Sequence, residues 1–594
     1  MQRCRSPSGP RARTVDNPAI ARLLGEIADL LEIKGENPFK IRAYRNASES
    51  VASAAERLAD LDEPRLLQIA GLGRDLAKKV REIAETGGAE YHRELLAEFP
   101  PTLLDLMRLQ GVGPLTVRQL HAELAINTLD DLEAALQDGR IRQIRGMGAR
   151  KQEAMLKALA DHRRHAGRHL LTETAETAAA LVASLREQEP GVQFIPVGSL
   201  RRGCDTCGDL DVLAVGASPA VMDRFTTYAL VDRVLGRGET KSSVLLRGGQ
   251  QADLRLVPPA SRGAAMQYFT GSTPHNIALR DRALRLGLKL NEYGLFRVSD
   301  NERIAGETEE GIYAALGLPW IPPELREAHG ELEAAEDGEL PALIDRPDLR
   351  GDLHAHTTAT DGRDSIEAMA LAARDAGLEY LAITDHSQAL AMANGLDERR
   401  ALEHARRVRE VSSHLGTIAL LAGIECDIRA DGTLDLAHDC LAELDYVVAS
   451  IHSSFGQSEQ EMTDRVLRAM ECPWVDTVGH PTGRILLRRE PHKARLDQII
   501  DAAARLGVAL EINCQVDRLD LSDVNARHAR ERGVKLVIGS DAHSTRAFTT
   551  LAWGVTVARR AWATSADVLN TQPLEALQTS LRRHRARPIH APAS

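Results

Sequence analysis

The sequence predicts a multidomain protein that combines α+β and α/β domains. Its 594 residues exceed what one hydrophobic core usually serves. Apolar residues recur every three or four positions from about residue 17 to 170, as in IARLLGEIADLLEI, which is typical of helices. Short β runs separated by turns follow, from about 190 to 320. After 350, strand-like runs alternate with helical stretches, which predicts a third part with parallel strands.

Composition excludes several classes of protein. The hydrophobic fraction of 43% is ordinary for a folded globular chain, and no apolar run is long enough to span a membrane. Seven cysteines without framework spacing fit a reduced cytoplasmic protein. The N-terminus, MQRCRSPSGPRAR, lacks an apolar core, so residues 1–15 are predicted to be a disordered basic tail rather than a secretory signal. A second basic tail is expected at 581–594. The net charge of −11 argues weakly against nucleic-acid binding but says little about local patches.

A short glycine pattern recurs three times in the helical part. Each copy has an apolar residue, then Gly-apolar-Gly, then a helix; the glycine pairs are Gly71 and Gly73, Gly111 and Gly113, and Gly146 and Gly148. Glycine permits a tight turn that leaves backbone N–H groups free at a helix N-terminus, where a phosphate oxygen binds well. One copy alone fits a structural helix hairpin. Three copies favour binding to a DNA backbone without sequence readout.

The segment GSLRRGCDTCGDLDVLAV contains an acidic pair. Asp209 and Asp211 lie two apart on a predicted strand and therefore share one face. Asp253, in QADLRLV, is expected on a neighbouring strand. Adjacent carboxylates repel unless cations lie between them, and three aspartates suit a pair of Mg²⁺ or Mn²⁺ ions for displacement at phosphorus. Cys204 and Cys207 lie in the same segment, but no second cysteine pair completes a zinc site.

Polar residues follow the apolar runs of the last part. Parallel barrels place such strand ends on one active face. The candidate metal ligands there are His354, His356, Asp361, His386, Glu425, His452, His480, Asp541 and His543. Imidazole and carboxylate ligands suit Mn²⁺, Zn²⁺ or Fe²⁺, and nine ligands suggest about three ions. Arg484 and Arg518 are either phosphate contacts or ordinary surface arginines.

These motifs together resemble bacterial family X DNA polymerases that end in a polymerase and histidinol phosphatase (PHP) domain. The glycine hairpins resemble helix-hairpin-helix motifs, EIADLLEIKGENPFKIRAYRNA resembles the family's N-terminal segment, and YFTGSTPHNIALR resembles a second polymerase element. The resemblance implies a domain order: an N-terminal helical lyase-type domain at 16–100, a helix-hairpin-helix region at 101–175, a nucleotidyltransferase palm at 176–260, a thumb-like nucleotide-selecting part at 261–320, a linker at 321–350, and a distorted β/α barrel, the PHP domain, at 351–580.

The resemblance also implies roles for individual residues. Asp209 and Asp211 would bind both polymerase metals, and Asp253 would bind the catalytic metal and assist deprotonation of the primer 3′-hydroxyl. The residues implied in nucleotide binding are Ser199, Arg202, Gly208, Tyr268, Phe269, Gly271 and Asn276, and Arg280 matches a template contact. Lys79 matches a lyase lysine that forms a Schiff base with an abasic sugar; a phosphate contact is the alternative.

We therefore expect a polymerase that fills gaps during DNA repair and trims DNA ends through the PHP domain. The resemblance implies 3′–5′ exonuclease activity there, together with processing of 3′-phosphates or abasic sites. Gapped or nicked DNA and deoxynucleoside triphosphates are the expected partners, with no membrane, for a monomer in the cytoplasm at the nucleoid. Two alternatives stay open: a nuclease with weak synthesis, and a DNA-binding scaffold with structural metals.

Overall fold

A computed structural model describes residues 17–582, apart from Ser53, Ala55, Arg57, Ala70, Arg108, Gln110, His165 and Ala166. The chain divides into two compact units, Met1–Ala166 and Gly167–Ser594. The predicted tail at 1–15 and all but two residues of the tail at 581–594 lie outside the described residues. Within the described part, no helix has both the length and the apolar character needed to cross a membrane.

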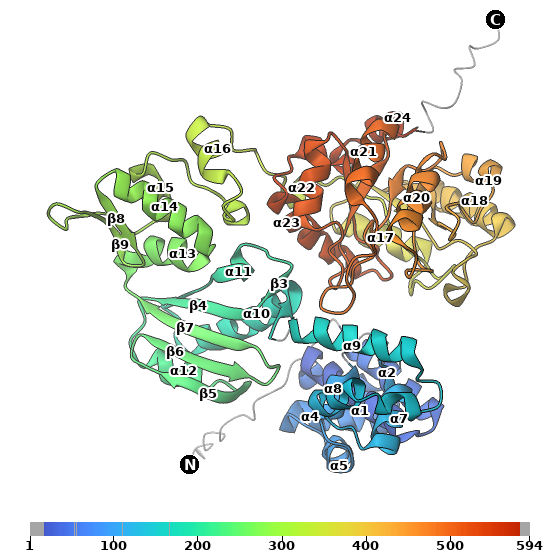
Figure 1. Cartoon of the computed structure of the whole chain (residues 1–594), viewed down its shortest axis with the longest axis horizontal. Helices are drawn as coiled ribbons and strands as arrows, with labels where there is room; N and C mark the ends of the chain where they lie inside the picture. The colour runs from blue at the N-terminus through green and yellow to red at the C-terminus, as the bar shows by residue number, and fades with distance from the viewer. Residues whose placement is uncertain are drawn as a thin grey trace, which may run out of the picture. The chain divides into compact units, whose positions relative to one another are not determined.

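The described part of the first unit is helical, as the periodicity predicts (Figure 1). Its helices are α1 (Asn17–Lys34), α2 (Pro38–Ala52), α3 (Glu63–Leu66), α4 (Arg74–Thr86), α5 (Glu90–Glu98), α6 (Thr102–Met107), α7 (Pro114–Leu124), α8 (Leu129–Gln137) and α9 (Ala149–Arg164). They enclose two apolar clusters, one along α1, α2 and α4 and the other between α6 and α9. Ile33, near the end of α1, packs in the second cluster and so ties the two halves together.

The second unit begins with a five-stranded sheet in the order β2-β4-β7-β6-β5. Its elements, with the short pair β1 and β3, are β1 (His169–Leu170), α10 (Leu171–Gln188), β2 (Gln193–Pro196), α11 (Gly198–Arg201), β3 (Thr206–Cys207), β4 (Asp209–Val215), α12 (Val221–Thr226), β5 (Val231–Arg237), β6 (Lys241–Leu246) and β7 (Gln251–Val257). Strands β4 and β7 pair in parallel, and the other neighbours pair antiparallel. Apolar residues of α10 and α12 pack on the sheet.

A small helical layer with a three-stranded sheet follows. It comprises α13 (Arg262–Thr270), α14 (Thr273–Arg285), β8 (Leu288–Asn291), β9 (Gly294–Arg297), β10 (Arg303–Ala305), α15 (Glu309–Ala315) and α16 (Glu331–Asp337). The stretch 321–350, expected to be a linker, contains α16 and is packed rather than bare. Ile321, Leu325 and Ala335 are buried in the same apolar cluster as α14 and α15, which explains how so polar a segment is held in place.

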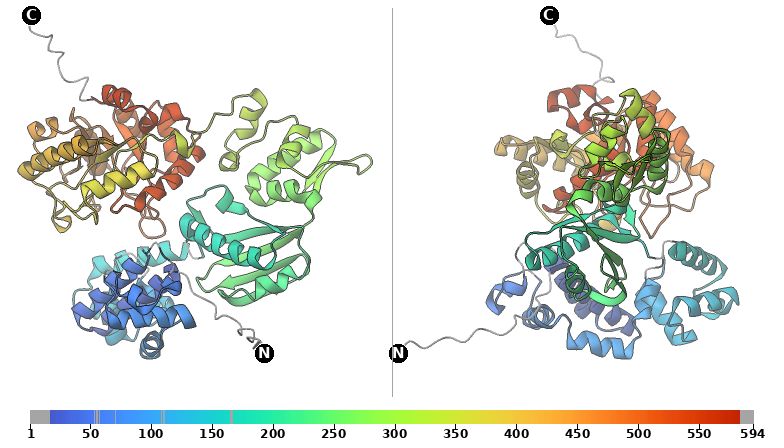
Figure 2. Two further views of the ribbon diagram at one scale, coloured as in Figure 1. Left: turned by 180° about the vertical axis from the view of Figure 1, so that it is seen from behind. Right: turned by 90° about the vertical axis from the view of Figure 1, so that its left-hand side faces the viewer.

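The C-terminal part is a parallel barrel of seven strands in sequence order, β11 to β17. Its elements are β11 (Gly351–Asp352), α17 (Ile366–Asp375), β12 (Tyr380–Ile383), α18 (Glu398–Leu415), β13 (Ala419–Asp427), α19 (His438–Ala442), β14 (Tyr446–Ser450), α20 (Glu459–Met470), β15 (Thr477–Val478), α21 (Leu496–Leu506), β16 (Ala509–Asn513), α22 (Asp523–Glu531), β17 (Leu536–Gly539), α23 (Leu551–Arg560) and α24 (Leu574–Ser580). A parallel bridge between Ala355 and Ala542 joins the first edge to the last, so the barrel is nearly closed. Both views of Figure 2 show helices outside the strands.

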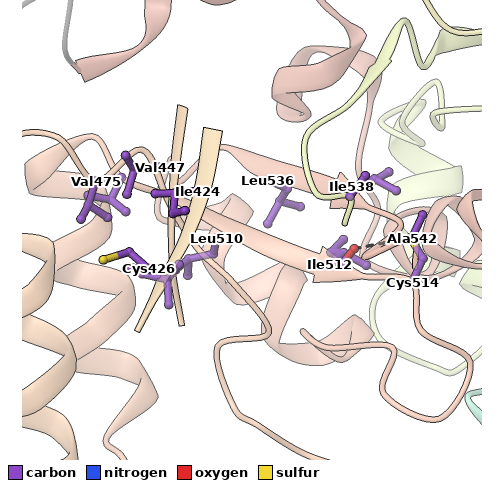
Figure 3. Close-up of a cluster of buried hydrophobic side chains, with 14 of the residues drawn as sticks. Ile424, Cys426, Val447, Val475, Leu510, Ile512, Cys514, Leu536, Ile538 and Ala542 are labelled. Carbon is purple, nitrogen blue, oxygen red and sulfur yellow. Dashed lines mark hydrogen bonds between the residues drawn. The ribbon is translucent and has the colours of Figure 1, made fainter. Parts of the chain in front are cut away.

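The barrel strands alternate between two apolar clusters. Ile424, Val447, Leu510 and Ile538 belong to the larger cluster, which also contains apolar residues of the surrounding helices (Figure 3). Residues of the other parity, such as Leu421, Val448 and Val537, belong to a second cluster that Leu577 of α24 joins. Because side chains alternate along a strand, the residues that continue this second parity toward the carboxyl ends also face the interior. Glu425 is one of them, four positions after Leu421.

Candidate active sites

The acidic residues of the palm sheet lie on two adjacent strands. Asp211 of β4 is the register partner of Asp253 of β7, and Asp209 lies two residues earlier on the same strand. The parallel pairing places Asp211 and Asp253 side by side on one face, as expected from the sequence. The oxygens of the three aspartates do not all come within 4.8 Å of one another, however, since they form none of the close ligand groups found in the described residues.

Two basic residues that the sequence analysis missed lie beside these carboxylates. Lys241 of β6 places its Nζ 2.7 Å from Asp253 Oδ2, and Arg255 lies 4.0 Å from Asp211. Burial raises the pKa of Asp211 to about 6, and the charges of Asp209 and Asp253 add to the rise. Burial also acts to raise the pKa of Asp253, but hydrogen bonds from Lys241, Ser243 and Gln251 outweigh it and lower the pKa. The three carboxylates are hard oxygen donors of the kind that Mg²⁺ and Mn²⁺ prefer, so they fit these ions.

The predicted nucleotide-binding residues lie around α11 and the turn between α13 and α14. Ser199 lies within α11 and Arg202 follows its last residue. Arg202 pairs with Glu327 at 2.9 Å and donates to the carbonyl of Thr270. A side chain at Gly208 would meet no atom within 4 Å, so this backbone is open to a ligand. Cys204 and Cys207 are both free thiols.

The turn after α13 gathers the remaining predicted polymerase residues. The rings of Tyr268 and Phe269 meet edge to face at 5.0 Å. Asn276 donates through Nδ2 to the Tyr268 carbonyl at 2.7 Å, so the two residues are fixed together. Gly271 has a left-handed φ of 73°, and Arg280 is exposed on α14. Arg280 is therefore free to meet a nucleic acid.

The barrel brings its nine predicted ligands to one end. Eight of them form three groups whose ligand atoms lie within 4.8 Å: His356, Asp361, His386 and His543; His354, His356 and Asp541; and His386, Glu425 and His452. His480 joins them through Nε2, which lies 2.9 Å from Glu425 Oε1. Three overlapping groups are the arrangement that about three ions need.

The donor chemistry of these groups fits transition metals. Nε2 of His354 and both ring nitrogens of His356 are buried and make no hydrogen bond of normal geometry within the described part of the chain. Burial lowers the pKa of His356 to about 4, and the charges of His386 and His543 lower it further, so this imidazole is neutral and able to bind a metal. Neutral imidazoles beside carboxylates suit Mn²⁺, Zn²⁺ or Fe²⁺.

Three carboxylates behind the ligands were missed by the sequence analysis. Glu511 Oε1 lies 2.7 Å from His354 Nδ1, and Asp427 Oδ2 lies 3.3 Å from His452 Nδ1. Asp385, next to His386, accepts hydrogen bonds from the hydroxyls of Thr357 and Thr360. Such partners orient metal-binding imidazoles. The available signal for Glu511 was a carboxylate inside an otherwise apolar run, VALEINC, like Glu425 inside ALLAGIECD.

Arg484 of the barrel, expected to be either a phosphate contact or an ordinary surface arginine, is largely buried. Its Nη1 lies 3.0 Å from Asp205 Oδ2 and its Nε donates to the carbonyl of Arg518. Asp205 belongs to the loop after α11, so Arg484 links the barrel to that loop. Its burial does not fit an ordinary surface arginine, and its hydrogen bonds within the chain disfavour a contact with substrate phosphate.

The glycine hairpins have the backbone that phosphate binding requires. Gly71, Gly111 and Gly146 have left-handed φ values of 84°, 76° and 86°. Gly73 and Gly113 are extended residues directly before α4 and α7. A side chain added at Gly73, Gly113 or Gly148 would meet no atom within 4 Å. The second glycines therefore leave open space in front of the helix N-termini.

Lys79 lies on α4 beside an aromatic ring. Its Nζ is 4.7 Å from the centre of the Tyr91 ring, which Lys40 Nζ also approaches, at 4.9 Å. Lys40 donates to the Tyr91 hydroxyl at 2.8 Å, and the Tyr44 ring stacks at 6.3 Å. The sequence analysis named Lys79 but not Lys40 or Tyr91. The amino groups of Lys79 and Lys40 therefore lie against one aromatic ring.

Comparison with known proteins covers most of the chain. Family models match residues 15–89 (helix-hairpin-helix domain), 103–161 (SAM-like helix-hairpin-helix tandem), 171–242 (DNA polymerase beta palm), 265–327 (DNA polymerase beta thumb) and 352–515 (PHP domain). The chain is 35% identical to the DNA polymerase/3′-5′ exonuclease PolX of Bacillus subtilis, over 95% of this chain and 99% of that protein. It is 27% identical to DNA polymerase lambda of Rattus norvegicus over 54% of the chain and 58% of the relative. A probable phosphatase of Acetivibrio thermocellus is 30% identical over 32% of the chain and 78% of its own length.

Proposed function

This chain belongs to the PolX family of DNA polymerases with a PHP domain, and from that premise we propose that it fills gaps in damaged DNA and trims the 3′ ends at which it synthesises. The register pairing of Asp211 with Asp253 is the observation that carries the synthetic half. The convergence of nine ligands in the barrel supports the hydrolytic half. Removal of 3′-phosphates and cleavage at abasic sites are further reactions of the same hydrolytic site, and the similarity to a probable phosphatase supports the first of them.

In the palm site, Asp209, Asp211 and Asp253 would hold two divalent cations. Those cations supply charge neutralisation for the triphosphate and for the attacking oxygen. Asp253 is a carboxylate at neutral pH. It accepts the proton of the primer 3′-hydroxyl once Lys241 no longer pairs with the Asp253 carboxylate. Ser199 and Arg202 bind the triphosphate, and the turn at Tyr268, Phe269 and Gly271 disfavours a ribose.

In the barrel site, the nine ligands would hold about three ions, with Mn²⁺, Zn²⁺ or Fe²⁺ as the fitting metals. Bound metals supply a water of lowered pKa and offset the charge of the phosphate ester. Glu511 and Asp427 fix the rings of His354 and His452 by accepting from their Nδ1 atoms. We expect the chain to act on DNA as a monomer in the cytoplasm.

Lys79 is proposed as the nucleophile of a lyase reaction on abasic DNA. Its amino group lies against the Tyr91 ring, which Lys40 also approaches. Borohydride trapping on a duplex with an abasic site should label wild type and not Lys79→Ala. The matched control is Lys78→Ala, whose side chain is exposed on the same helix. Equal trapping of wild type and Lys79→Ala would leave Lys79 with the phosphate-contact role.

The main experiment uses a gapped duplex with a labelled primer and Mg²⁺ or Mn²⁺, with and without deoxynucleotides. Wild type should extend the primer when nucleotides are present and shorten it when they are absent. Asp211→Ala should lose extension and keep shortening, and His354→Ala should do the reverse. A single change that removes both activities would contradict two separate sites.

The same assay separates the remaining alternatives. Shortening without any extension by wild type would identify a nuclease with weak synthesis. Neither product, with tight DNA binding, would favour a scaffold whose metals serve folding. The aspartates on adjacent strands support a working polymerase site, and the buried imidazole nitrogens without a hydrogen bond support a metal site in the barrel.

A further inference from the structure

Helix α23 of the barrel packs against the loop that follows α11 in the palm. A Cβ atom at Gly203 would lie 2.2 Å from Thr556 Cγ2, so only glycine permits this approach. Arg560, the last residue of α23, donates from Nη1 to the carbonyl of Arg202 at 2.8 Å. The backbone of a predicted triphosphate-binding residue is therefore held by a residue of the barrel.

One carboxylate oxygen joins the two arginines. Glu327 Oε1 lies 2.9 Å from Arg202 Nε and 3.0 Å from Arg560 Nη1. The side chains of Glu327 and Arg560 are only 19% and 9% exposed, so solvent screens these charges weakly. Asp523 of α22 holds the other edge of the Arg560 guanidinium, 2.8 Å from Nε. Arg560 is thus fixed on two sides.

Arg202 also reaches the turn that the sequence predicts to select nucleotides. Its Nη1 donates to the carbonyl of Thr270 at 2.5 Å and lies 3.1 Å from the position of a Cβ on Gly271. The guanidinium therefore contacts Glu327 on one side and the turn on the other. A triphosphate that binds Arg202 must compete with Glu327 for it.

We propose that Arg560 is a positioning residue for nucleotide binding, which acts on Arg202 through Glu327 and through the Arg202 carbonyl. This inference rests on the proposed function, in which Arg202 binds the triphosphate. Arg560 shares the charge of Glu327 and so weakens the hold of Glu327 on Arg202. Without Arg560, Glu327 pairs with Arg202 alone and competes better with phosphate, and the Arg202 carbonyl loses a shielded donor. The barrel then supports the polymerase site in addition to its own hydrolytic site.

The test compares steady-state kinetics of the full chain on gapped DNA. Arg560→Ala should raise KM for the deoxynucleotide about tenfold, the effect of one lost shielded charged hydrogen bond. The values of kcat, KM for DNA and 3′-end trimming should not change. Arg559→Ala is the matched control: Arg559 is the neighbour on α23, pairs with Glu324 at 2.7 Å and donates to the Ile344 carbonyl. An equal rise in KM in the two variants would mean that any loosening of the barrel packing has this effect, and it would overturn the proposal.

A double variant isolates the charge competition. Adding Glu327→Gln to Arg560→Ala replaces the competing carboxylate with a neutral amide of the same shape. KM for the nucleotide should then fall back toward the wild-type value, and the two changes should be strongly non-additive. A KM that stays as high as in Arg560→Ala would overturn the competition argument.

Cys204 gives a readout that needs no synthesis. Its Sγ lies 3.5 Å from Glu327 Oε1, and it is the one free cysteine of the described residues that is not buried. The charge of Arg560 acts to lower the pKa of the Cys204 thiol, and the thiolate is the form that reacts. Peptide mapping after iodoacetamide treatment should therefore show slower alkylation of Cys204 in Arg560→Ala, but not in Arg559→Ala. A wild type that adds no nucleotide would refute the proposed function, whereas Cys204 labelling would still test the contact. If Arg560→Ala fails to fold, Asp523→Asn should shift both readouts in the same direction, and a folded variant without either shift refutes the role of Arg560.

Discussion

Glu309 is a buried carboxylate that joins two arginines. Its side chain is 4% exposed and lies 2.6 Å from both Arg201 Nη2 and Arg326 Nη1. Burial opposes its ionisation, but hydrogen bonds and charge from Arg201 and Arg326 lower its pKa to about 2. Because the pKa in the folded state lies below the ordinary value of 4.5, the ionised Glu309 carboxylate stabilises the fold at neutral pH. This contribution to stability is lost as the pH falls from about 4.5 toward 2.

Glu309→Gln should therefore lower the free energy of unfolding at pH 7 by about 3 kcal/mol. Urea denaturation at pH 7 and at lower pH measures the difference, which should begin to shrink below about pH 4.5 as wild-type Glu309 takes up its proton. Glu310→Gln, a change at the exposed neighbour, should have no comparable effect. A pH-independent difference would mean that the ion pairs do not set the stability.

Glu511 should control the metal affinity of the barrel although it is not one of the nine ligands. Oε1 orients His354, and Oε2 accepts from the backbone N–H of His480 at 2.7 Å. In Glu511→Gln, the amide NH₂ replaces one of the two oxygens and so faces either His354 Nδ1 or the His480 N–H, where an acceptor is needed. Trimming at limiting Mn²⁺ should fall about 10- to 100-fold and recover as Mn²⁺ is raised, while nucleotide addition is retained.

Asp445→Asn provides the matched control for Glu511→Gln. Asp445 precedes β14, at the opposite end of the barrel strands, and accepts from the Ala422 N–H at 2.9 Å. The Asp445→Asn variant should leave the Mn²⁺ dependence of trimming unchanged. The same shift in both variants would point to a general loss of barrel stability rather than to orientation of His354.

At the scale of single elements, different glycines of the helix-hairpin-helix region should affect DNA binding and protein stability. Gly113 has a φ of −93°, which any residue adopts, and an added side chain would meet no protein atom. Gly113→Ala should keep the thermal stability but weaken DNA binding several-fold, equally for different sequences, because the methyl group blocks the approach of the DNA backbone.

Gly139 supplies the converse control for this element. Its φ is 78° and it lies outside the three hairpins, so Gly139→Ala should lower stability and leave DNA affinity unchanged. Fluorescence anisotropy over a range of salt concentrations measures both affinities, and the salt slope should fall only for variants that lose a phosphate contact. Unchanged DNA binding in Gly113→Ala would count against the hairpin account.

Elements with a clear period were predictable, and contacts between distant elements were not. Alternation along β4 predicts that Asp209 and Asp211 share a face, and parallel strand ends predict that His354 and Asp541 meet. The local sequence pattern does not predict that Lys241 faces Asp253, or that Arg201 contacts Glu309, 108 residues away. Periodicity specifies a face of an element, whereas the tertiary fold decides which faces meet. The polar stretch 321–350 shows the same limit, because a few buried residues such as Ile321 and Leu325 hold it in place in a way that its composition does not reveal.

At the scale of the molecule, two chemistries on phosphorus lie in one compact unit that excludes the helical N-terminal part. The barrel contacts the rest of this unit through ion pairs: Arg484 pairs with Asp205 of the palm. Arg559 and Arg560 pair with Glu324 and Glu327 of the segment 321–350. These contacts tie the barrel to the loop after α11 and to the segment 321–350, so a change at this interface reaches the polymerase side. Family matches alone specify which domains are present and leave this coupling open.

Metal binding should stabilise the second unit and not the first, because the ligand groups found in the described residues all belong to the barrel. Mn²⁺ at about 100 times its Kd should add about 3 kcal/mol per site to the unfolding free energy. Calorimetry should show an upward shift of one transition, reversed by a chelator, with the transition of the helical unit unmoved. Asp211→Asn should keep most of the shift and His354→Asn should lose most of it. A shift of equal size in both variants would mean that the ions bind elsewhere, and the assignment of the nine ligands would then be wrong.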